Sequence, residues 1–451
     1  MRDLLLAAFL LAFFALALKR PFLFVLTYVY VDIVAPQLLG YGFLIGKPIS
    51  LIAAAMAVGS WLLVDARRGF TFTTRGALTL LLLAYCFLTT LSADLPEAAW
   101  GKWEWVWKSL FFGIFLPLTL RTRLRVEAVL LVMMLSAAAL VISGGVKTLA
   151  GGGGYGTLVM LVQDNSGLYE GSTASCIAIA IIPIILWMAK HGTIFPPDWR
   201  VRTFAYALCF ACLLIPIGTQ TRTGLLCIGL LAVLMLRGNK HRFLYMGGAA
   251  MLALAAVPLL PQSFTARMGT IQDHQSDQSA STRLAVWAWT IDFVGDNPMG
   301  GGFEAYLQNR VRVETVAGQS SGAVERISTS AVVDEGRAWH SAYFEMLGEQ
   351  GFPGLALFLL IHLIGLARME RLRRRYADAG PDDAWIAPLA TALQHFQLVY
   401  LLGAAFIAVA FQPFVWLVMG VQIGFDRWVS RREKATRVPR PFAPRLQASP
   451  A

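Results

Sequence analysis

Long apolar runs separated by short polar segments make up most of the chain. Thirteen of these runs approach the length that an α-helix needs to cross a bilayer, about 20 residues. They lie at 4–18, 21–38, 49–64, 76–92, 104–120, 126–142, 172–189, 203–218, 224–236, 243–260, 351–366, 391–410 and 414–428. Asp32 and Pro36 interrupt the second run. The pattern predicts an all-α polytopic membrane protein with about 12 transmembrane helices.

One long polar segment divides the apolar runs. We therefore expect membrane helices over residues 1–260, a loop domain with amphipathic helices over 261–350, and membrane helices again over 351–428. A basic, proline-rich tail over 429–451 is expected to be disordered and attracted to anionic lipid.

Within the loop domain, helical spacing predicts a helix over 281–294 that lies at the membrane surface. Its apolar positions are Leu284, Trp287, Ile291 and Val294. Ser281 is expected to be its N-cap.

Composition agrees with a membrane protein. Of the 451 residues, 57% are hydrophobic and 14% are charged, and the mean hydropathy is +0.60. A soluble domain carries about 25% charged residues. The N-terminal stretch MRDLLLAAFLLAFFALALKRP lacks a small-residue cleavage site. We expect it to be a retained membrane segment rather than a signal peptide.

The net charge of +11 is concentrated in short segments between the apolar runs. Two runs separate each consecutive pair of basic loops, as the positive-inside rule requires of loops that share the cytoplasmic side. These loops are 65–75, 121–125, 190–202, 237–242 and 367–376. The distribution argues against a nucleic-acid partner, and it predicts that the loop domain lies on the opposite, external side.

No pattern indicates a metal or a cofactor. The five cysteines lie in or beside apolar runs, without the spacing of metal ligands or of a disulfide framework. The segment GGVKT at 144–148 does not have the spacing of a P-loop. Asp273 and Asp277 are four residues apart in a Gln/Ser-rich segment, where we expect no metal.

Four tryptophans stand close together in WGKWEWVWK, at 100–108, beside the external end of a span. Such residues commonly form an aromatic belt at the membrane interface. The alternative is a platform on which sugar rings stack.

Arg222 lies in a short external turn, GTQTRTG, at membrane depth. An arginine at this depth is costly unless it pairs, lines a wet cavity or snorkels to the interface. Its guanidinium is permanently charged and presents a fork of donors that matches phosphate oxygens. Snorkelling and an anion site both explain the position.

Arg283 stands at the expected start of the surface helix. A cation there opposes the helix dipole, whereas the free N–H groups of a helix start attract anions. The position therefore favours a bound anion, and the alternative is a solvated surface arginine.

Of the six histidines, only His340 joins the loop domain to an amphipathic stretch. An imidazole titrates near about 6.5, so it can accept a proton from a hydroxyl at neutral pH. Two arginines and one histidine suggest a reaction on a lipid pyrophosphate. The arginines neutralise the leaving group, and the histidine deprotonates the incoming hydroxyl.

Three stretches, in this order, resemble the O-antigen ligase and polymerase superfamily of bacterial envelope glycosyltransferases. TQTRTGLL is similar to the family's Arg–Gly turn, and STRLAVWAWTIDFVGDNPMGGGFEAY to its Arg-x-x-x-Trp helix with a Gly-rich turn. HSAYFEMLGEQGFPGLALFLL is similar to its His block, although Ser341 stands where many relatives have Asn. RPFLFVLTYVYVDIVAPQ and QDNSGL resemble the ligases associated with exosortase systems.

The resemblance implies an O-antigen ligase with a GT-C type fold in the bacterial inner membrane, its active site facing the periplasm. Such an enzyme transfers a glycan from undecaprenyl pyrophosphate to a sugar hydroxyl of lipid A–core, in lipopolysaccharide biosynthesis and without a metal. By this resemblance Arg222 and Arg283 bind the pyrophosphate and His340 is the general base. Gln220, Tyr343 and Arg267 are expected to support them.

Three other functions remain open at this point. A polymerase would use a second lipid-linked glycan as its acceptor, and a protein O-oligosaccharyltransferase would use a protein hydroxyl. A lipid-linked glycan transporter would do no chemistry. Transporters often show internal repeats and charges at the midplane, and the sequence has no clear repeat.

Overall fold

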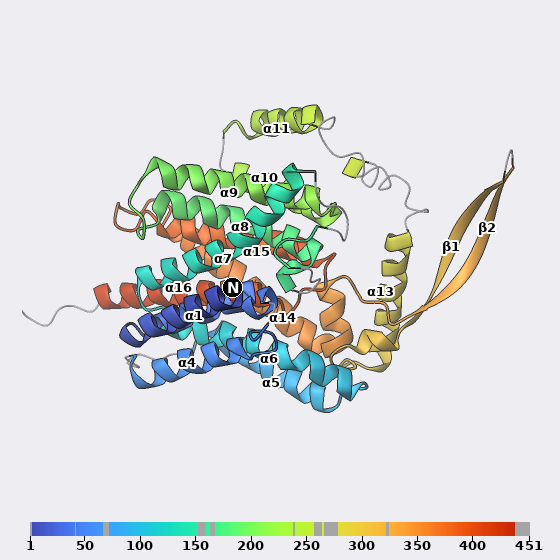
Figure 1. The fold of residues 1–451 in the computed structure, drawn as a ribbon, viewed down its shortest axis with the longest axis horizontal. Coiled ribbons are helices and arrows are strands. Elements are labelled where there is room, and N and C mark those ends of the chain that lie inside the picture. Colours follow the sequence, from blue (N-terminus) through green and yellow to red (C-terminus); the bar gives the residue numbers. More distant parts are fainter. Residues whose placement is uncertain are drawn as a thin grey trace, which may run out of the picture.

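The computed structural model describes residues 2–40, 42–65, 72–151, 158–162, 167–237, 240–256, 264–265, 278–321 and 324–437 (Figure 1). Regular structure in these residues is helical except for one two-stranded sheet. The long helices run roughly side by side, and the sheet projects from one end of them.

Each of the thirteen predicted runs coincides with a helix. These helices are α1 (Arg2–Lys19), α2 (Phe22–Val34), α4 (Ile49–Leu63), α5 (Thr74–Leu91), α6 (Pro96–Thr119), α7 (Arg123–Leu149), α8 (Gly171–His191), α9 (Trp199–Gly218), α10 (Arg222–Leu236), α11 (Arg242–Ala256), α14 (Ala342–Arg375), α15 (Ile386–Ala404) and α16 (Pro413–Arg437). Short helices α3 (Pro36–Leu39) and η1 (Gly167–Tyr169) connect some of them.

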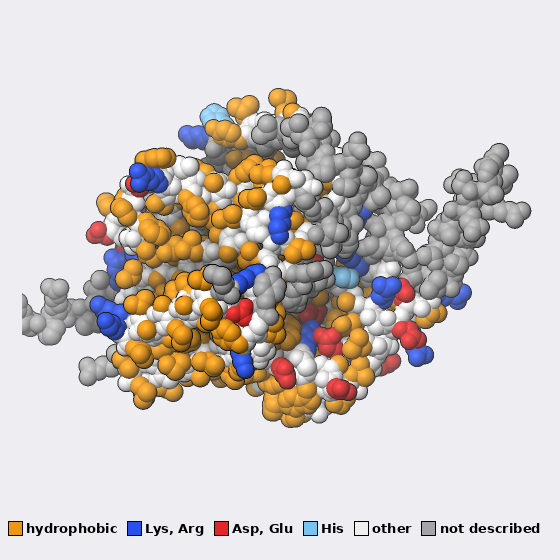
Figure 2. Space-filling view, in the orientation of Figure 1, with side chains coloured by type: hydrophobic (Ala, Val, Ile, Leu, Met, Phe, Trp, Pro, Cys, Tyr) orange, Lys and Arg blue, Asp and Glu red, His pale blue; other side chains and the backbone are white. Residues whose placement is uncertain are grey.

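The prediction of an all-α polytopic membrane protein is confirmed. Among the described helices, α5, α7, α8, α9, α14 and α15 are long and apolar enough to cross a bilayer, and α2, α4 and α10 are shorter apolar helices. Large side chains such as Leu63, Leu88 and Leu363 are exposed on the bundle surface. Figure 2 shows hydrophobic side chains covering much of the visible face of the bundle. The number of about 12 spans stays a prediction.

Polar side chains explain where several helices begin. The hydroxyl of Thr73 accepts a hydrogen bond from the Gly76 amide at the start of α5, and Thr122 does the same at α7. The carboxylate of Asp198 caps α9. Each residue satisfies a backbone donor that a helix start otherwise leaves open.

One predicted span is too long. The run 391–410 leaves the helical conformation at Ala404, and residues 405–412 connect α15 to α16 without regular structure. Pro413 disfavours a helical conformation in the residue before it. Side chains supply hydrogen bonds to the backbone of this apolar connection. Val409 O accepts from Tyr400 Oη, and Ala410 O accepts from Trp416 Nε1.

The loop domain contains a helix α13 (Gln278–Asp296), a 3₁₀ turn η4 (Ala305–Gln308) and an antiparallel hairpin. Strands β1 (Arg310–Ser321) and β2 (Val324–Glu335) pair from Arg310↔Glu335 to Ser321↔Val324. The prediction of amphipathic helices alone was therefore incomplete. The alternation of apolar and charged residues in RVRVETV is typical of a strand.

The helix predicted over 281–294 begins three residues earlier, at Gln278, so Ser281 is not its N-cap. Leu284 and Ile291 are exposed, and Val286, which was not among the predicted apolar positions, is fully buried. The position of this helix at the membrane surface stays a prediction. Val286 belongs to a small core with Ala305, Val311 and Trp339. This core joins α13 to η4, to β1 and to the segment that precedes α14.

The tail predicted to be disordered is helical in its first part. Helix α16 continues to Arg437. Glu433 fixes this extension, because its carboxylate accepts from Tyr376 Oη at 2.7 Å and pairs with Arg375 at 2.9 Å. Residues 438–451 lie outside the described residues.

Candidate functional site

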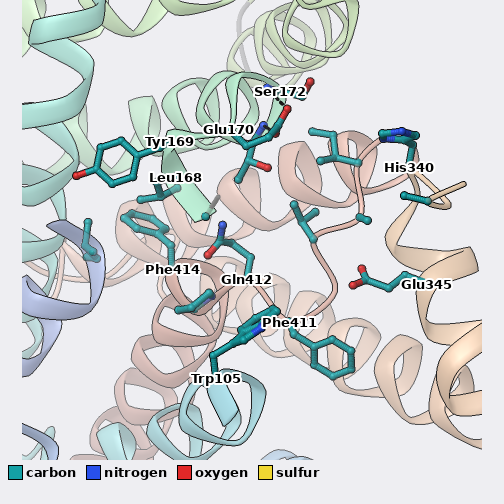
Figure 3. A pocket seen from close by; sticks show the side chains of 18 of the residues that line it. Trp105, Leu168, Tyr169, Glu170, Ser172, His340, Glu345, Phe411, Gln412 and Phe414 are labelled. Atoms are coloured by element: carbon teal, nitrogen blue, oxygen red, sulfur yellow. Dashed lines mark hydrogen bonds between the residues drawn. The ribbon is translucent and has the colours of Figure 1, made fainter. Parts of the chain in front are cut away.

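A cavity of about 630 Å³ lies at the end of the bundle that carries the loop domain (Figure 3). Its wall comes from the end of α2, from residues 167–173, from α13, from the segment around His340 and from the connection 406–412. The charged side chains on the wall are Asp32, Glu170, Arg283 and Glu345, and His340 adds an imidazole.

His340 is held at this cavity by the backbone around it. The amide side chain of Asn309, which is fully buried, donates to Arg337 O at 2.7 Å and accepts from Arg337 N at 2.9 Å. Trp287 Nε1 donates to Trp339 O at 2.9 Å. These bonds fix His340 in a left-handed conformation, with φ of 47°, which non-glycine residues adopt only where their surroundings impose it.

The pKa of the His340 ring is lowered from its ordinary value. The largest cause is partial burial, and the positive charge of Arg283 acts in the same direction, whereas the Glu170 carboxylate opposes both. The lowered pKa favours the neutral ring, the form that can accept a proton. Arg283 and Glu170 line the same cavity as the ring.

Arg283 lines the same cavity as His340. Arg283 and Trp287 are four residues apart on α13, so they share one face of the helix. Trp287 bonds to the residue before His340, and the helix thereby brings Arg283 to the histidine. Because α13 starts at Gln278, Arg283 lies in its second turn. The expected placement of Arg283 at the helix start was therefore wrong, and the helix dipole, which acts within the first turn, does not explain an anion there. That Arg283 binds an anion stays a prediction.

Arg222 is instead the residue at the start of a helix. It is the first residue of α10, whose N-cap Thr221 makes no side-chain cap bond. Gln220 precedes it with φ of 53° and is buried. Neither residue lines the cavity, but their turn packs beside it. Thr219 Oγ1 lies 2.7 Å from Ser175 Oγ on α8, the helix that begins just after Glu170.

Of the other two expected supporting residues, only Tyr343 is among the described residues. The hydroxyl of Tyr343 donates to Leu401 O at 2.7 Å and ties α14 to α15, and Tyr343 does not line the cavity. Arg267 lies outside the described residues, as do Asp273 and Asp277.

Glu170 and Glu345 are carboxylates that the sequence interpretation did not single out. Glu170 accepts from the Ser172 and Thr173 amides, at 2.9 and 2.6 Å, and so caps α8. Glu345 accepts from the Ala410 amide at 3.0 Å and from Lys102 Nζ at 2.7 Å. Both carboxylates are thus satisfied within the protein. Figure 3 shows Glu345 on the same side of the cavity as His340.

Lys102 connects the cavity to a buried charge cluster. Its ammonium lies 2.7 Å from Glu345 Oε1, 2.7 Å from Glu349 Oε1 and 3.6 Å from Glu304 Oε1. Lys102, Glu345 and Glu349 are all buried. No sequence signal predicted this cluster, because Lys102 lies more than 240 positions from the α14 carboxylates.

One tryptophan of the WGKWEWVWK stretch lines the cavity. Trp105 is 42% exposed and lies near Phe411 and Gln412 (Figure 3). Trp103 instead packs on Phe87 and Phe303. An exposed indole on a cavity wall can stack against a sugar ring, so Trp105 is the candidate for such a platform, and both interpretations of the stretch stay predictions.

Among the described residues, no group of three or more His, Cys, Asp or Glu side chains could hold a metal ion. The expected absence of a metal remains a prediction.

Two protein families match consecutive parts of the chain. Residues 1–193 match a family of unknown function (DUF5935), and residues 207–359 match the O-Antigen ligase family. The second match contains Arg222, Arg283 and His340, and the first contains Lys102 and Glu170. No curated protein matches the chain.

Proposed function

Through residues 207–359 the chain belongs to the O-antigen ligase superfamily, and on this premise we propose that it is an O-antigen ligase of the bacterial inner membrane. It transfers a glycan from undecaprenyl pyrophosphate to a sugar hydroxyl of lipid A–core, in a GT-C type fold. The observation that carries the proposal is that Arg283 and His340 line one cavity at the loop-domain end of the bundle.

The proposed reaction is a single displacement. The acceptor hydroxyl oxygen attacks the anomeric carbon of the donor glycan, and its proton passes to the neutral His340 ring. The bond between the anomeric carbon and the pyrophosphate oxygen breaks, and undecaprenyl pyrophosphate leaves with the bonding electrons. Arg283, and Arg222 from the adjacent turn, balance the charge of the leaving group. One base on the face opposite the leaving group fits an inverting reaction.

The composition of the cavity supports a glycan as the ligand. Trp105 offers a ring face, and Asp32 and Gln412 offer polar groups to sugar hydroxyls. Glu170 and Glu345 are already bonded inside the protein, which reduces their repulsion of a pyrophosphate.

The charge pattern supports a periplasmic active site. Helix α16 carries the described part of the basic tail, and it ends on the side of the bundle away from the hairpin (Figure 1). The positive-inside rule assigns such a basic end to the cytoplasm. The cavity then faces the periplasm, where lipid-linked glycan and lipid A–core meet.

The proposal is tested with purified protein, undecaprenyl-pyrophosphate-linked glycan and lipid A–core, with the product followed on a gel. We expect His340→Ala to lower the rate of transfer by roughly 10²–10⁴-fold, the contribution of a general base, while donor binding is kept. His241→Ala, in the loop before α11, is the matched control and should transfer normally. Undiminished transfer by His340→Ala would remove the base assignment.

The acceptor is decided by three parallel reactions with the same donor. We expect product with lipid A–core. Product only with a second lipid-linked glycan would make the protein a polymerase, and product only with a protein hydroxyl would make it an O-oligosaccharyltransferase. Donor movement across a vesicle without any product would favour a transporter.

A further inference from the structure

A second cavity, of about 280 Å³, lies at the other end of the helices that build the first one. It is enclosed by the start of α5, the second half of α14 and the end of α16. Five cationic side chains line it, together with a single carboxylate, Asp426. The cations are Arg75, Arg368, Arg427, Arg431 and Lys434.

Arg75 is a buried cationic side chain on the wall of this cavity. It is 4% exposed, and its Nη2 atom donates to Gln422 Oε1 at 2.9 Å. Its Nε and Nη1 atoms are buried and make no hydrogen bond to any described residue. A buried guanidinium with open donors is costly unless a ligand accepts from it.

The orientation of Arg75 is fixed by amide side chains behind it. Gln422 Nε2 donates to Gln397 Oε1 and to Leu393 O, each at 3.1 Å. This leaves the oxygen of Gln422 to accept from Arg75. The guanidinium is thus held in place before any ligand arrives.

Cationic side chains outnumber carboxylates on the wall of this cavity. Asp426 Oδ2 lies 3.8 Å from Arg368 Nε, so the two residues form a long ion pair. Asp426 is the one carboxylate among the residues that line the cavity, beside five cationic side chains. Anion binding relieves their mutual repulsion.

The location matches a membrane interface. On α14, Glu345 lines the first cavity and Arg368 lines the second, 23 residues further along. At 1.5 Å per residue this separation is at most roughly 35 Å, because α14 is kinked at Gly351, and it is close to the thickness of the hydrocarbon core, about 30 Å. The second cavity therefore lies on the predicted cytoplasmic side, where anionic lipids are abundant.

Phe72, Ile364 and Ile423 line the same cavity. A ligand that fits here carries an anionic group for the arginines and an apolar part for these side chains. We propose that this cavity binds the phosphate headgroup of an anionic phospholipid of the cytoplasmic leaflet. The bound lipid joins α5, α14 and α16, two of which also line the first cavity.

The test measures lipid binding to the purified full-length protein by native mass spectrometry, with phosphatidylglycerol and phosphatidylcholine as probes. We expect selective retention of phosphatidylglycerol. The double variant Arg431→Gln/Lys434→Gln changes two helix-end residues and should weaken this binding by roughly 30-fold. The matched control, Arg374→Gln/Lys190→Gln, removes the same charge from exposed helix ends outside the cavity and should weaken it less than about 3-fold.

Arg75→Gln tests the buried donor. In wild-type protein we expect added phosphatidylglycerol to raise the melting temperature, and in folded Arg75→Gln we expect that rise to be lost. Equal retention of both lipids, equal losses in the two double variants, or an unchanged lipid-induced rise in folded Arg75→Gln would overturn the proposal. Displacement of the lipid by millimolar inorganic phosphate would assign the cavity to a soluble phosphate and overturn it as well. None of these results depends on transfer activity.

Discussion

At the scale of single residues, the environment of His340 sets the pH range of the proposed reaction. Its pKa lies below the ordinary 6.5 because of partial burial and Arg283. The base is the neutral ring, so we expect transfer to be constant above that pKa and to fall as the pH drops through it.

The fall of the transfer rate at low pH is the acid limb of the pH profile. Two substitutions should shift this acid limb in opposite directions. Glu170→Gln removes the charge that raises the pKa, so the limb should shift to lower pH. Arg337→Gln removes a charge that lowers it, so the limb should shift to higher pH. The measurement is the transfer rate from pH 5 to 8 at saturating donor. Shifts of the same sign in both variants would contradict the assignment of His340 as the base.

The two arginines should differ in their effect on donor binding. Arg283 lines the cavity, whereas Arg222 lies on the neighbouring turn. Loss of a charged hydrogen bond costs about 1.5–3 kcal/mol, so we expect Arg283→Ala to raise the Kd of the lipid pyrophosphate by roughly 10- to 100-fold. Arg222→Ala should have a smaller effect.

Equilibrium binding of labelled donor to protein in detergent measures both constants. Arg200→Ala, exposed in the first turn of α9, is the control and should bind normally. An unchanged affinity for the donor in both variants would favour the alternatives, in which Arg222 snorkels to the interface and Arg283 is a solvated surface residue.

At the scale of elements, the kink of α14 is fixed by a glycine-rich turn. Gly351 interrupts the helix with φ of 61°. The turn 298–302 lies directly against it, since Gly302 N donates to Glu349 O at 2.9 Å and Phe352 N donates to Pro298 O at 3.0 Å. The kink lets one continuous segment carry both the cavity carboxylate Glu345 and a membrane span.

Gly351→Ala should therefore destabilise the protein. Its Cβ atom would lie 2.2 Å from Pro298 O, and the backbone conformation itself costs an alanine about 1–3 kcal/mol. We expect a clear drop in melting temperature in detergent. Gly229→Ala, in α10 with nothing within 4 Å of the added atom, should melt at or slightly above the wild-type temperature. Equal melting of the two variants would contradict this account.

At the scale of the whole molecule, the ion pairs and hydrogen bonds of the Lys102 cluster link the helix bundle to the loop domain and to residues beside the cavity. The cluster joins α6 to the start of α14, and through Glu304 and the Ala410 amide it reaches η4 and the α15–α16 connection. Lys102→Met would leave buried carboxylates unpaired, at a cost of about 3–5 kcal/mol.

Thermal unfolding in detergent measures this cost. Lys190→Met, which removes an exposed lysine from the end of α8, is the control and should change stability by at most about 0.5 kcal/mol. A Lys102→Met protein as stable as the control would mean that the cluster contributes no net stability.

The sequence alone predicted which segments form the membrane helices and named candidate site residues. Apolar runs of membrane length allow few other structures, because a bilayer leaves backbone groups no partner outside a helix. The expected helix start at Arg283 and the position of His340 before an apolar stretch singled out two residues that line the same cavity. These patterns are local, so they can be read from short windows.

Only the tertiary structure decided what surrounds these residues. Glu170, Lys102 and Trp105 reach the site from parts of the chain far from His340, and no local period records such pairings. Helix ends were also decided by contacts, since α13 starts before its expected cap and α15 stops inside an apolar run. Burial makes each buried polar group require a partner, and that partner is chosen by the packing of helices rather than by the neighbouring sequence.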